Sequence, residues 1–438
     1  MTDSLYTAIT DVPPDVESDQ TDTHRARRFS VVGATWALFL GLAFLMMGNG
    51  LQSSLVGLRA ESEGFSTTVT GIVMSFYFVG FLFGTRIANH ALRNVGHIRV
   101  FSALASVASS SVLIYAISVN PYTWAMMRFV TGVCFAGLYV VVEGWLNNLA
   151  TNQNRGRIMA SYMVISIGGV GAGQVFLSTG ATGGSDLFIV ASVLVSLALV
   201  PVALSNTSTP PLYTPIAMPI REIWRIVPTG LTTSFLTGIG NGALFGMGAA
   251  YASAAGLSAG RIGLFILMPM IGAVIFQFPI GTISDRVSRR AVIFAVALAA
   301  TIVPLALEWT EPNSRLSFFL MFLLGGAVFP LYSLGIAYTN DWLPGEQIVG
   351  AAGQLVFTNG LGAVLGPFVA SAFITGFGNQ GFFLSMVLAH GLLTLYAGYR
   401  IIAKDALPVS RQGHFVPYPS RASGMAAALL SPRRRKES

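Results

Sequence analysis

The chain has 438 residues, of which 53% are apolar and only 10% are charged. A soluble globular protein carries about 25% charged residues, because charge covers its surface, so this chain would expose large apolar patches in water. The high apolar content equally excludes intrinsic disorder. The mean hydropathy of +0.67 indicates a chain whose solvent is mostly lipid, and its 48 glycines are typical of closely packed membrane helices.

The inventory of reactive residues excludes several kinds of chemistry. The single cysteine, Cys134, allows no intrachain disulfide and no cysteine-based metal cluster. The two lysines, Lys404 and Lys436, do not follow a glycine-rich run, which excludes a P-loop. The five histidines form neither a metalloprotease nor an acyltransferase pattern. We therefore predict that the protein is not an enzyme and uses no cofactor and no metal.

Apolar stretches of about 20 residues, the length that crosses roughly 30 Å of hydrocarbon, recur from residue 30 onward. Backbone groups in lipid must pair within their own segment, so each stretch is predicted to be a helix. The fold class is therefore an all-α membrane protein with twelve transmembrane helices in two six-helix bundles. The predicted spans are 31–54, 67–88, 100–118, 123–146, 158–178, 187–205, 227–252, 261–283, 290–309, 315–338, 350–374 and 380–402.

The arrangement of basic residues predicts the orientation. An even number of spans places both termini on one side of the membrane. If that side is the cytoplasm, all but four of the 25 basic residues lie in cytoplasmic segments. The exceptions are Arg59, Arg128, Arg261 and Arg315. This bias follows the positive-inside rule, and it explains the net charge of +7 without nucleic acid. We predict a multi-pass protein of the cytoplasmic membrane with both termini in the cytoplasm.

The longest interior polar stretch, Ser205–Arg225, follows the sixth span and indicates a division into two halves. The predicted parts are a cytoplasmic polar tail at 1–28, an N-terminal bundle at 29–205, a cytoplasmic linker at 206–226, a C-terminal bundle at 227–402 and a basic cytoplasmic tail at 403–438.

An internal repeat supports this division. When the chain is shifted by 192 residues, Gly48-Asn49-Gly50 matches Gly240-Asn241-Gly242. Without a gap, Gly71 then matches Gly263, and Gly80 matches Gly272. A duplicated six-helix unit with parallel halves is the pattern of one large transporter fold.

The most specific local motif follows the eighth span and reads Gly281-Thr-Ile-Ser-Asp285-Arg286-Val-Ser-Arg289-Arg290. It resembles the signature loop of the major facilitator superfamily, G-x-x-x-D-R-x-G-R-R, with Ser288 in place of the second glycine. The alternative interpretation is an ordinary positive-inside loop. The resemblance implies a cytoplasmic gate that includes Gly281, Asp285, Arg286, Arg289 and Arg290.

The corresponding loop of the first half, Asn89–Arg99, departs from this pattern. The repeat places Arg93 opposite Asp285, so the acid is missing, and Gly96 opposite Ser288. The first half is therefore expected to use other partners at the gate.

The fourth span carries the one basic residue that is predicted to lie inside the membrane. Arg128-Phe-Val-Thr-Gly132 resembles the R-x-x-x-G of the superfamily, and the run 128–173 resembles its bacterial YcaD-like branch. A charge within a span is costly, so Arg128 should face the interior. It serves either substrate binding and coupling or a fixed structural pair.

Glu143, also in the fourth span, is the only acid well within any span. One interpretation places it in the cytoplasmic gate, paired with Arg99, His97 or Arg157. The sharper interpretation is a carboxyl that carries protons across the membrane.

Asn49 and Asn241 occupy equivalent positions in the repeat, each between two glycines. In the superfamily that the sequence resembles, spans 1, 4, 7 and 10 line the transport cavity, which makes both asparagines substrate or coupling candidates. Tyr332 and Asn359 are further candidates. The alternative for each is an interhelical hydrogen bond that fixes helix packing.

Together these features predict a secondary transporter that moves a small solute by alternating access, with proton coupling as a hypothesis. The expected partners are a small solute, the lipid bilayer and protons, the protein acts as a monomer, and nucleic acid is not a partner. One alternative is a non-transporting membrane sensor of the same fold. Among transporters, drug efflux and metabolite uptake both remain open.

Overall fold

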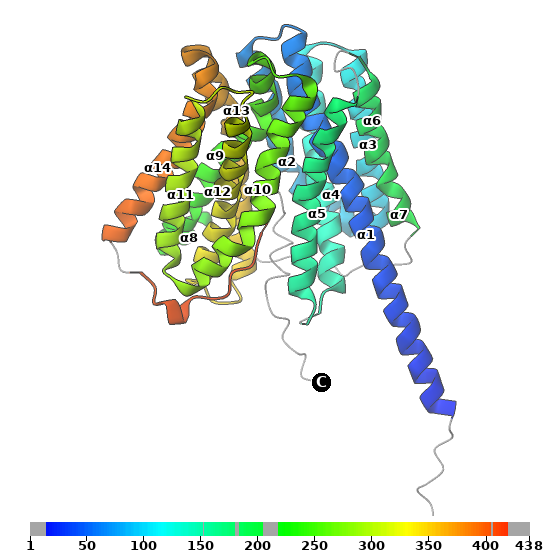
Figure 1. The fold of residues 1–438 in the computed structure, drawn as a ribbon. Coiled ribbons are helices and arrows are strands. Elements are labelled where there is room, and N and C mark those ends of the chain that lie inside the picture. Colours follow the sequence, from blue (N-terminus) through cyan, green and yellow to red (C-terminus); the bar gives the residue numbers. More distant parts are fainter. Residues whose placement is uncertain (1–14, 152, 180–183, 205–217, 404–405, 419–438) are drawn as a thin grey trace, which may run out of the picture.

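The computed structural model describes residues 15–151, 153–179, 184–204, 218–403 and 406–418, with side chains from residue 35 onward. Within these ranges every regular element is a helix, as Figure 1 shows. This confirms the predicted all-α fold class. Residues 1–14, which belong to the predicted N-terminal tail, lie outside the described ranges.

The first half contains six helical crossings. They are α1 (Asp15–Ser62), α2 (Thr67–Val95), α3 (His97–Ile117), α4 (Pro121–Leu149), α5 (Arg155–Val175) with its extension η1 (Phe176–Ser178), and α6 (Asp186–Leu197) with α7 (Leu199–Ala203). Local sequence sets several ends. The side chain of Asn120 accepts hydrogen bonds from the first amides of α4, and Gly96, at φ 84°, separates α2 from α3.

The second half begins with the short α8 (Ile220–Ile226). Six long helices follow: α9 (Pro228–Ala254), α10 (Ala259–Arg286), α11 (Arg289–Leu307), α12 (Arg315–Asn340), α13 (Ile348–Phe377) and α14 (Gly381–Ala403). The 3-10 turns η2 (Gly378–Gln380) and η3 (Val409–Arg411) complete the described elements.

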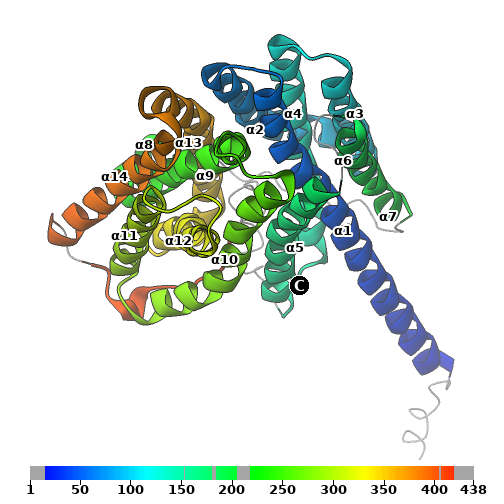
Figure 2. The same cartoon turned by 45° about the horizontal axis from the view of Figure 1, so that its top comes forward.

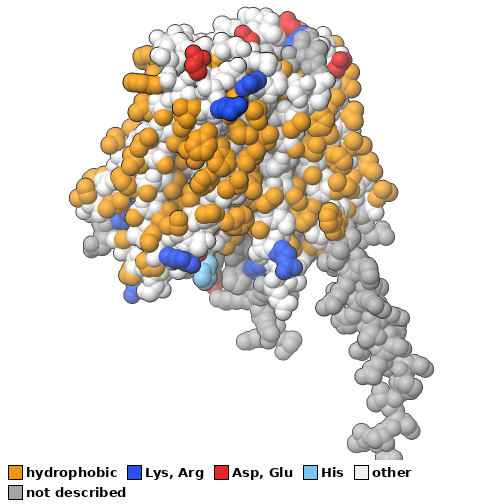
Figure 3. Space-filling model, viewed as in Figure 1, with side chains coloured by type: hydrophobic (Ala, Val, Ile, Leu, Met, Phe, Trp, Pro, Cys, Tyr) orange, Lys and Arg blue, Asp and Glu red, His pale blue; other side chains and the backbone are white. Residues whose placement is uncertain are grey.

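The surface and the helix lengths fit a membrane. Ten helical stretches of the described chain are long and apolar enough to cross a bilayer, and one of them, Ile348–Ala403, contains both α13 and α14. Figure 3 shows a broad belt of apolar side chains around the visible face, whereas most acidic side chains on that face lie at its upper end. A belt of this kind is what lipid contact requires.

The two halves repeat the same close helix crossings, and they lie beside one another as two bundles (Figure 2). A methyl group added to Gly80 of α2 would overlap the backbone oxygen of Phe129 in α4. Gly272 of α10 meets Phe322 of α12 in the same way. Because Gly80 and Gly272 are counterparts in the repeat, the duplicated glycines serve equivalent crossings.

Helices α1 and α9 meet on the axis that relates the halves. Ser53 Oγ donates to the backbone oxygen of Phe245 over 3.3 Å, and Ser253 Oγ donates to Glu61 Oε2 over 2.6 Å. The residues of each pair are 192 positions apart, so each contacts its own counterpart. Since counterparts touch only at a symmetry axis, the pseudo-twofold axis passes between α1 and α9.

The two ends of the molecule differ in how the halves approach one another. The terminal end is the end where α1 begins and α14 finishes, and the loop end is opposite (Figure 1). Towards the loop end, Gly71 of α2 packs against Pro367 of α13, and Gly263 of α10 packs against Gln174 of α5. Helices α5 and α10 diverge from there towards the terminal end in both views.

Three predicted boundaries differ from the structure. Helix α1 begins inside the predicted tail 1–28 and continues past residue 54 to Ser62. The predicted linker 206–226 contains α8 at its end, and its residues up to 217 lie outside the described ranges. Apolar composition marks only the part of a helix that lies in lipid, so helices that continue into water escape it.

The third difference concerns the predicted tail 403–438. Residues 406–418 pack against the C-terminal bundle, and Tyr418 is only 1% exposed. Residues 419–438, including the basic run Arg433–Lys436, lie outside the described ranges. The tail folds back because polar groups of the bundle bind its backbone, which composition does not show.

Candidate functional site

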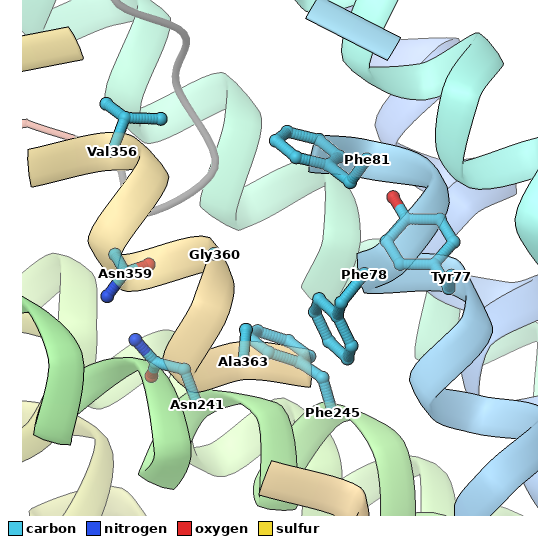
Figure 4. Close-up of a pocket in the computed structure, with 9 residues that line it drawn as sticks. All are labelled: Tyr77, Phe78, Phe81, Asn241, Phe245, Val356, Asn359, Gly360 and Ala363. Carbon is cyan, nitrogen blue, oxygen red and sulfur yellow. The ribbon is translucent and has the colours of Figure 1, made fainter. Parts of the chain in front are cut away.

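A small cavity lies between α2 of the first half and α9 and α13 of the second (Figure 4). Its volume of about 30 Å³ is close to that of one water molecule. Pockets for drug-sized ligands measure about 300 Å³ or more, so the cavity must widen before it holds such a solute. The lining residues are Tyr77, Phe78, Phe81, Asn241, Phe245, Val356, Asn359, Gly360 and Ala363.

The walls of the cavity differ in chemistry. Figure 4 shows the amides of Asn241 and Asn359 on one side and the aromatic rings from α2 on the other. Asn359 Nδ2 donates to the backbone oxygen of Ser234 in α9 over 2.9 Å. Amides opposite aromatic rings suit a solute with one polar edge and an apolar face.

Tyr77, on the aromatic side of the cavity, contacts two of the predicted residues, Arg128 and Asn49. The Arg128 guanidinium carbon lies 4.7 Å from the centre of the Tyr77 ring, and the Tyr77 hydroxyl donates to Asn49 Oδ1 over 3.4 Å. Arg128 and Asn49 are each only 1% exposed. A cation over an aromatic face is attracted by the ring, most strongly where water is excluded. Through Tyr77, Arg128 therefore contacts the lining of the cavity in this conformation.

The structure thus brings four of the five predicted substrate and coupling candidates to one region. Asn241 and Asn359 line the cavity, and Asn49 and Arg128 contact its Tyr77. Tyr332 lies elsewhere, nearer the terminal end. Sequence reasoning missed Tyr77, whose only signal is a hydroxyl within an apolar span of phenylalanines.

Glu143 lies in a second cluster, and its carboxyl is completely buried in α4. The hydroxyl of Tyr162 in α5 donates to Glu143 Oε1 over 2.5 Å. Tyr332 of α12 interacts electrostatically with the same carboxyl from the other half. The structure therefore adds a tyrosine partner that the sequence did not suggest.

The basic residues that were predicted to pair with Glu143 lie differently. Arg99 and Arg157 have exposed side chains. His97 is buried, with its ring 5.6 Å from that of Trp145. The gate interpretation of Glu143 therefore gains no support from these three side chains in this conformation.

The signature loop centres on Arg289, whose side chain is 1% exposed. Its guanidinium bonds to Asp285 Oδ1 over 2.8 Å and to Asp341 Oδ2 over 2.5 Å. It therefore ties the start of α11 to the ends of α10 and α12. Arg290 is also buried and donates to the Tyr338 hydroxyl over 3.0 Å and to the backbone oxygen of Arg400 over 2.8 Å. Both arginines are held by bonds within the second half.

Two further gate candidates, Arg286 and Gly281, lie in the same loop. Arg286 is exposed at the end of α10. Gly281 is buried against the ring of Phe415, where a methyl group would overlap that ring. Among the described residues, no group of three or more His, Cys, Asp or Glu side chains could hold a metal ion.

A larger cavity of about 280 Å³ opens at the loop end of the second half, between the ends of α9 and α11 and the start of α14. It contains Glu308, directly after α11, together with Tyr251 and Asn379. Burial raises the pKa of Glu308 to about 7, although a hydrogen bond from the Leu384 backbone opposes the shift. This carboxyl titrates near neutral pH at the loop end.

The chain is similar to known membrane transporters in sequence. The sequence profile described as Major Facilitator Superfamily matches residues 230–434. An uncharacterized MFS-type transporter, YcaD, from Escherichia fergusonii is 27% identical over 336 residues, 75% of this chain and 86% of that protein. YcaD from Escherichia coli O7:K1 is 26% identical over 353 residues, 79% of this chain and 90% of that protein.

Solved structures share the fold. A mutant of the nucleoside transporter NupG superimposes with a TM-score of 0.71 at 12% identity, over 84% of this chain and 99% of that one. A bacterial homologue of the human lysosomal transporter Spinster, in an inward-facing and occupied conformation, gives a TM-score of 0.67 at 14% identity, over 88% and 98% of the two chains. These matches bear out the resemblance seen in the signature loop: the chain is a multi-pass membrane protein with the fold of this superfamily, and it is similar over most of its length to MFS-type transporters.

Proposed function

We propose that the protein carries a small neutral or amphipathic solute by alternating access, through a pathway that includes the cavity between α2, α9 and α13. The observation that carries this proposal is that the cavity is shared between the halves, with Tyr77 on one and Asn241 and Asn359 on the other. A site built from both halves changes shape whenever the halves rock, as transport requires.

A ligand screen tests the site. A solute that binds the folded protein raises its stability by about 2.7 kcal/mol at a hundredfold excess over Kd. Thermal unfolding should be followed with nucleosides, sugars, amino acids and lipophilic amines. Nucleosides come first because NupG is a nucleoside transporter.

The variants Asn241→Ala and Asn359→Ala should lose the thermal shift that a hit produces. Gln354→Ala is the matched control, because Gln354 lies on α13 but does not line the cavity. Equal shifts in all three variants would exclude this cavity as the binding site.

We further propose that the terminal end faces the cytoplasm. Arg155, Arg157, Arg286 and Arg400 lie at or near that end, whereas Arg59, Arg261 and Arg315 lie at the loop end. The support is the positive-inside rule. In a Cys134→Ala background, a cysteine at exposed Gln153 should be labelled by a membrane-impermeant maleimide only after cells are opened, and labelling of intact cells would reverse the assignment.

Proton coupling through Glu143 is the last part of the proposal. Its carboxyl is buried beside Tyr162, Tyr332 interacts with it from the other half, and a proton on it removes the cost of a buried charge. Glu143→Gln should abolish proton-driven accumulation in proteoliposomes while preserving exchange of the solute. Tyr162→Phe, which removes the donor and keeps the carboxyl, should only weaken accumulation. Intact accumulation in Glu143→Gln would disprove this assignment.

A further inference from the structure

After α14 the chain turns back beneath the C-terminal bundle. Residues 406–418, which we call the C-terminal strap, include η3 and cross the terminal end below α11 and α12 towards the centre of the molecule (Figure 1). The strap begins on the outer side of the second half and ends at the buried Tyr418.

The backbone of the strap bonds to the charged groups of the signature loop. The amide of Gly413 donates to Asp341 Oδ1 over 2.9 Å, and Arg289 Nη2 donates to the oxygen of Gly413 over 2.8 Å. The amide of Phe415 donates to Asp285 Oδ1 over 2.8 Å. Bonds to charged groups are the stronger kind, so the strap is held at three charged side chains.

Side chains fix the register of the strap. Gln412 Oε1 accepts from the amide of Arg289 over 3.2 Å, and the ring of Phe415 occupies the space that Gly281 leaves by lacking a side chain. Further along, the amide and the oxygen of Tyr418 each bond to Ser333 Oγ of α12 over 2.9 Å. A segment with this many specific bonds is docked rather than merely adjacent.

The end of the strap lies between the two halves. The ring of Tyr418 is 6.0 Å from that of Tyr332 in the second half, and Tyr418 interacts electrostatically with Tyr162 in the first half. Tyr162 is the residue that donates to Glu143. Tyr418 therefore packs on α12 and lies within electrostatic range of Tyr162 in α5.

We propose that the loop 281–290 and the end of α12 form a docking surface for the C-terminal strap, and that the docked strap keeps the terminal end open. This inference rests on the proposed alternating access. Closure brings α5 and α12 together, and a buried tyrosine between them cannot be compressed. While docked, the strap also occupies Asp285, Arg289 and Asp341, which are then not available to the first half. The terminal end closes only after Tyr418 withdraws.

The distance between the halves tests the proposal directly. Spin labels at Gln153, after α4, and at exposed Val287, after α10, report the opening of the terminal end in a Cys134→Ala background. The full chain in lipid nanodiscs should give mainly long distances. Tyr418→Ala, and separately a chain that ends at Ala403, should shift the distribution to shorter distances.

Two controls test whether the expected shift in distance comes from the docked strap itself. A chain that ends at Tyr418 keeps the strap and should retain the long distances, and so should Ser410→Ala, which changes an exposed strap residue. If Tyr418→Ala does not fold, Gly413→Pro removes the amide that binds Asp341 and should give the same shift.

An unchanged or longer distance in the chain that ends at Ala403 would overturn the proposal. The measurement needs no substrate, so it is independent of the transport assay. If truncation shortens the distances but the protein binds none of the tested solutes, the result supports the proposed role of the strap. The same result counts against the proposed solute pathway.

Discussion

The two ends of the molecule are held by different kinds of contact. At the loop end, helices of the two halves pack directly through small residues, as Gly71 does on α13 and Gly263 on α5. At the terminal end, α5 and α10 diverge, and the C-terminal strap bonds to the signature loop of one half only. The loop end is symmetric in its construction, and the terminal end is not.

This difference shows what the duplication preserved. Gly71 and Gly263 are counterparts in the repeat, so the closed end is built twice from one pattern. The two loops at the terminal end have diverged, because Arg93 stands opposite Asp285 and is exposed. Where two helices cross closely, their backbones must approach one another, so few residues can replace glycine there. A cluster of charged and polar side chains, in contrast, can be built on one half alone.

The largest expected effect lies at the terminal end. Arg289→Ala leaves the carboxyl of Asp341, which is 3% exposed, without its cationic partner. Loss of one member of a buried ion pair costs about 3–5 kcal/mol. Unfolding in a titration with sodium dodecyl sulfate should show a loss of this size in the free energy of unfolding.

Two further variants determine whether the ion pair is responsible. Arg286→Ala changes an exposed arginine in the same loop and should cost less than about 0.5 kcal/mol. Adding Asp341→Asn to Arg289→Ala should recover part of the loss, because it removes the unpaired charge. Similar losses for Arg286→Ala and Arg289→Ala would mean that the terminal end is not held through Arg289.

The next effect tests the symmetry of the loop end. In Gly71→Ala the new methyl group meets Ser371 and Pro367, and in Gly263→Ala it meets the backbone oxygen of Gln174. Forcing extra volume into a packed contact costs about 1–3 kcal/mol. Both variants should lose stability to a similar extent, and spin labels at the loop end should report that the halves have separated.

Gly376→Ala is the matched control for these two variants. Gly376 lies near the loop end of α13, and a methyl group there meets nothing within 4 Å. The substitution should be neutral or stabilise the helix by about 0.5–1 kcal/mol. If only one of Gly71→Ala and Gly263→Ala separates the halves, the loop end is less symmetric than its glycines indicate.

Much of the fold could be predicted because lipid imposes simple rules on sequence. Span length led to the all-helical fold, and the repeat around Asn49 and Asn241 led to its two halves. The resemblance to the family came from the motif in the loop 281–290. Parts of the chain in water follow weaker rules. The docking of Phe415 depends on one hydrogen bond to Asp285 and on the gap at Gly281, and composition records neither.

The candidate site was predictable where charge or repetition marked a residue. Arg128 was found by the cost of its charge in lipid, and Asn241 by its counterpart in the repeat. Tyr77 and Tyr162 carry no such mark, because a tyrosine within an apolar span is usual. Tyr162 could have been found from geometry, since it and Glu143 lie at similar distances from the connection between α4 and α5 in an antiparallel helix pair.

The smallest expected effect concerns Glu308, a partly buried carboxyl at the loop end. Burial raises the pKa of Glu308 to about 7 from its ordinary value of 4.5, so the folded chain holds this proton more tightly than the unfolded chain. The stabilisation is complete below about pH 4.5, falls as the pH rises to about 7, and is absent above that. Because Glu308 is partly exposed, the change amounts to about 1 kcal/mol.

Glu308→Gln should remove this slope and match the parent chain at pH 4 but exceed it in stability at pH 8, as measured by thermal unfolding across that range. Glu311→Gln, which changes an exposed acid at the same end, should keep the parent slope. If Glu308→Gln also keeps it, the pH dependence of stability arises from another group.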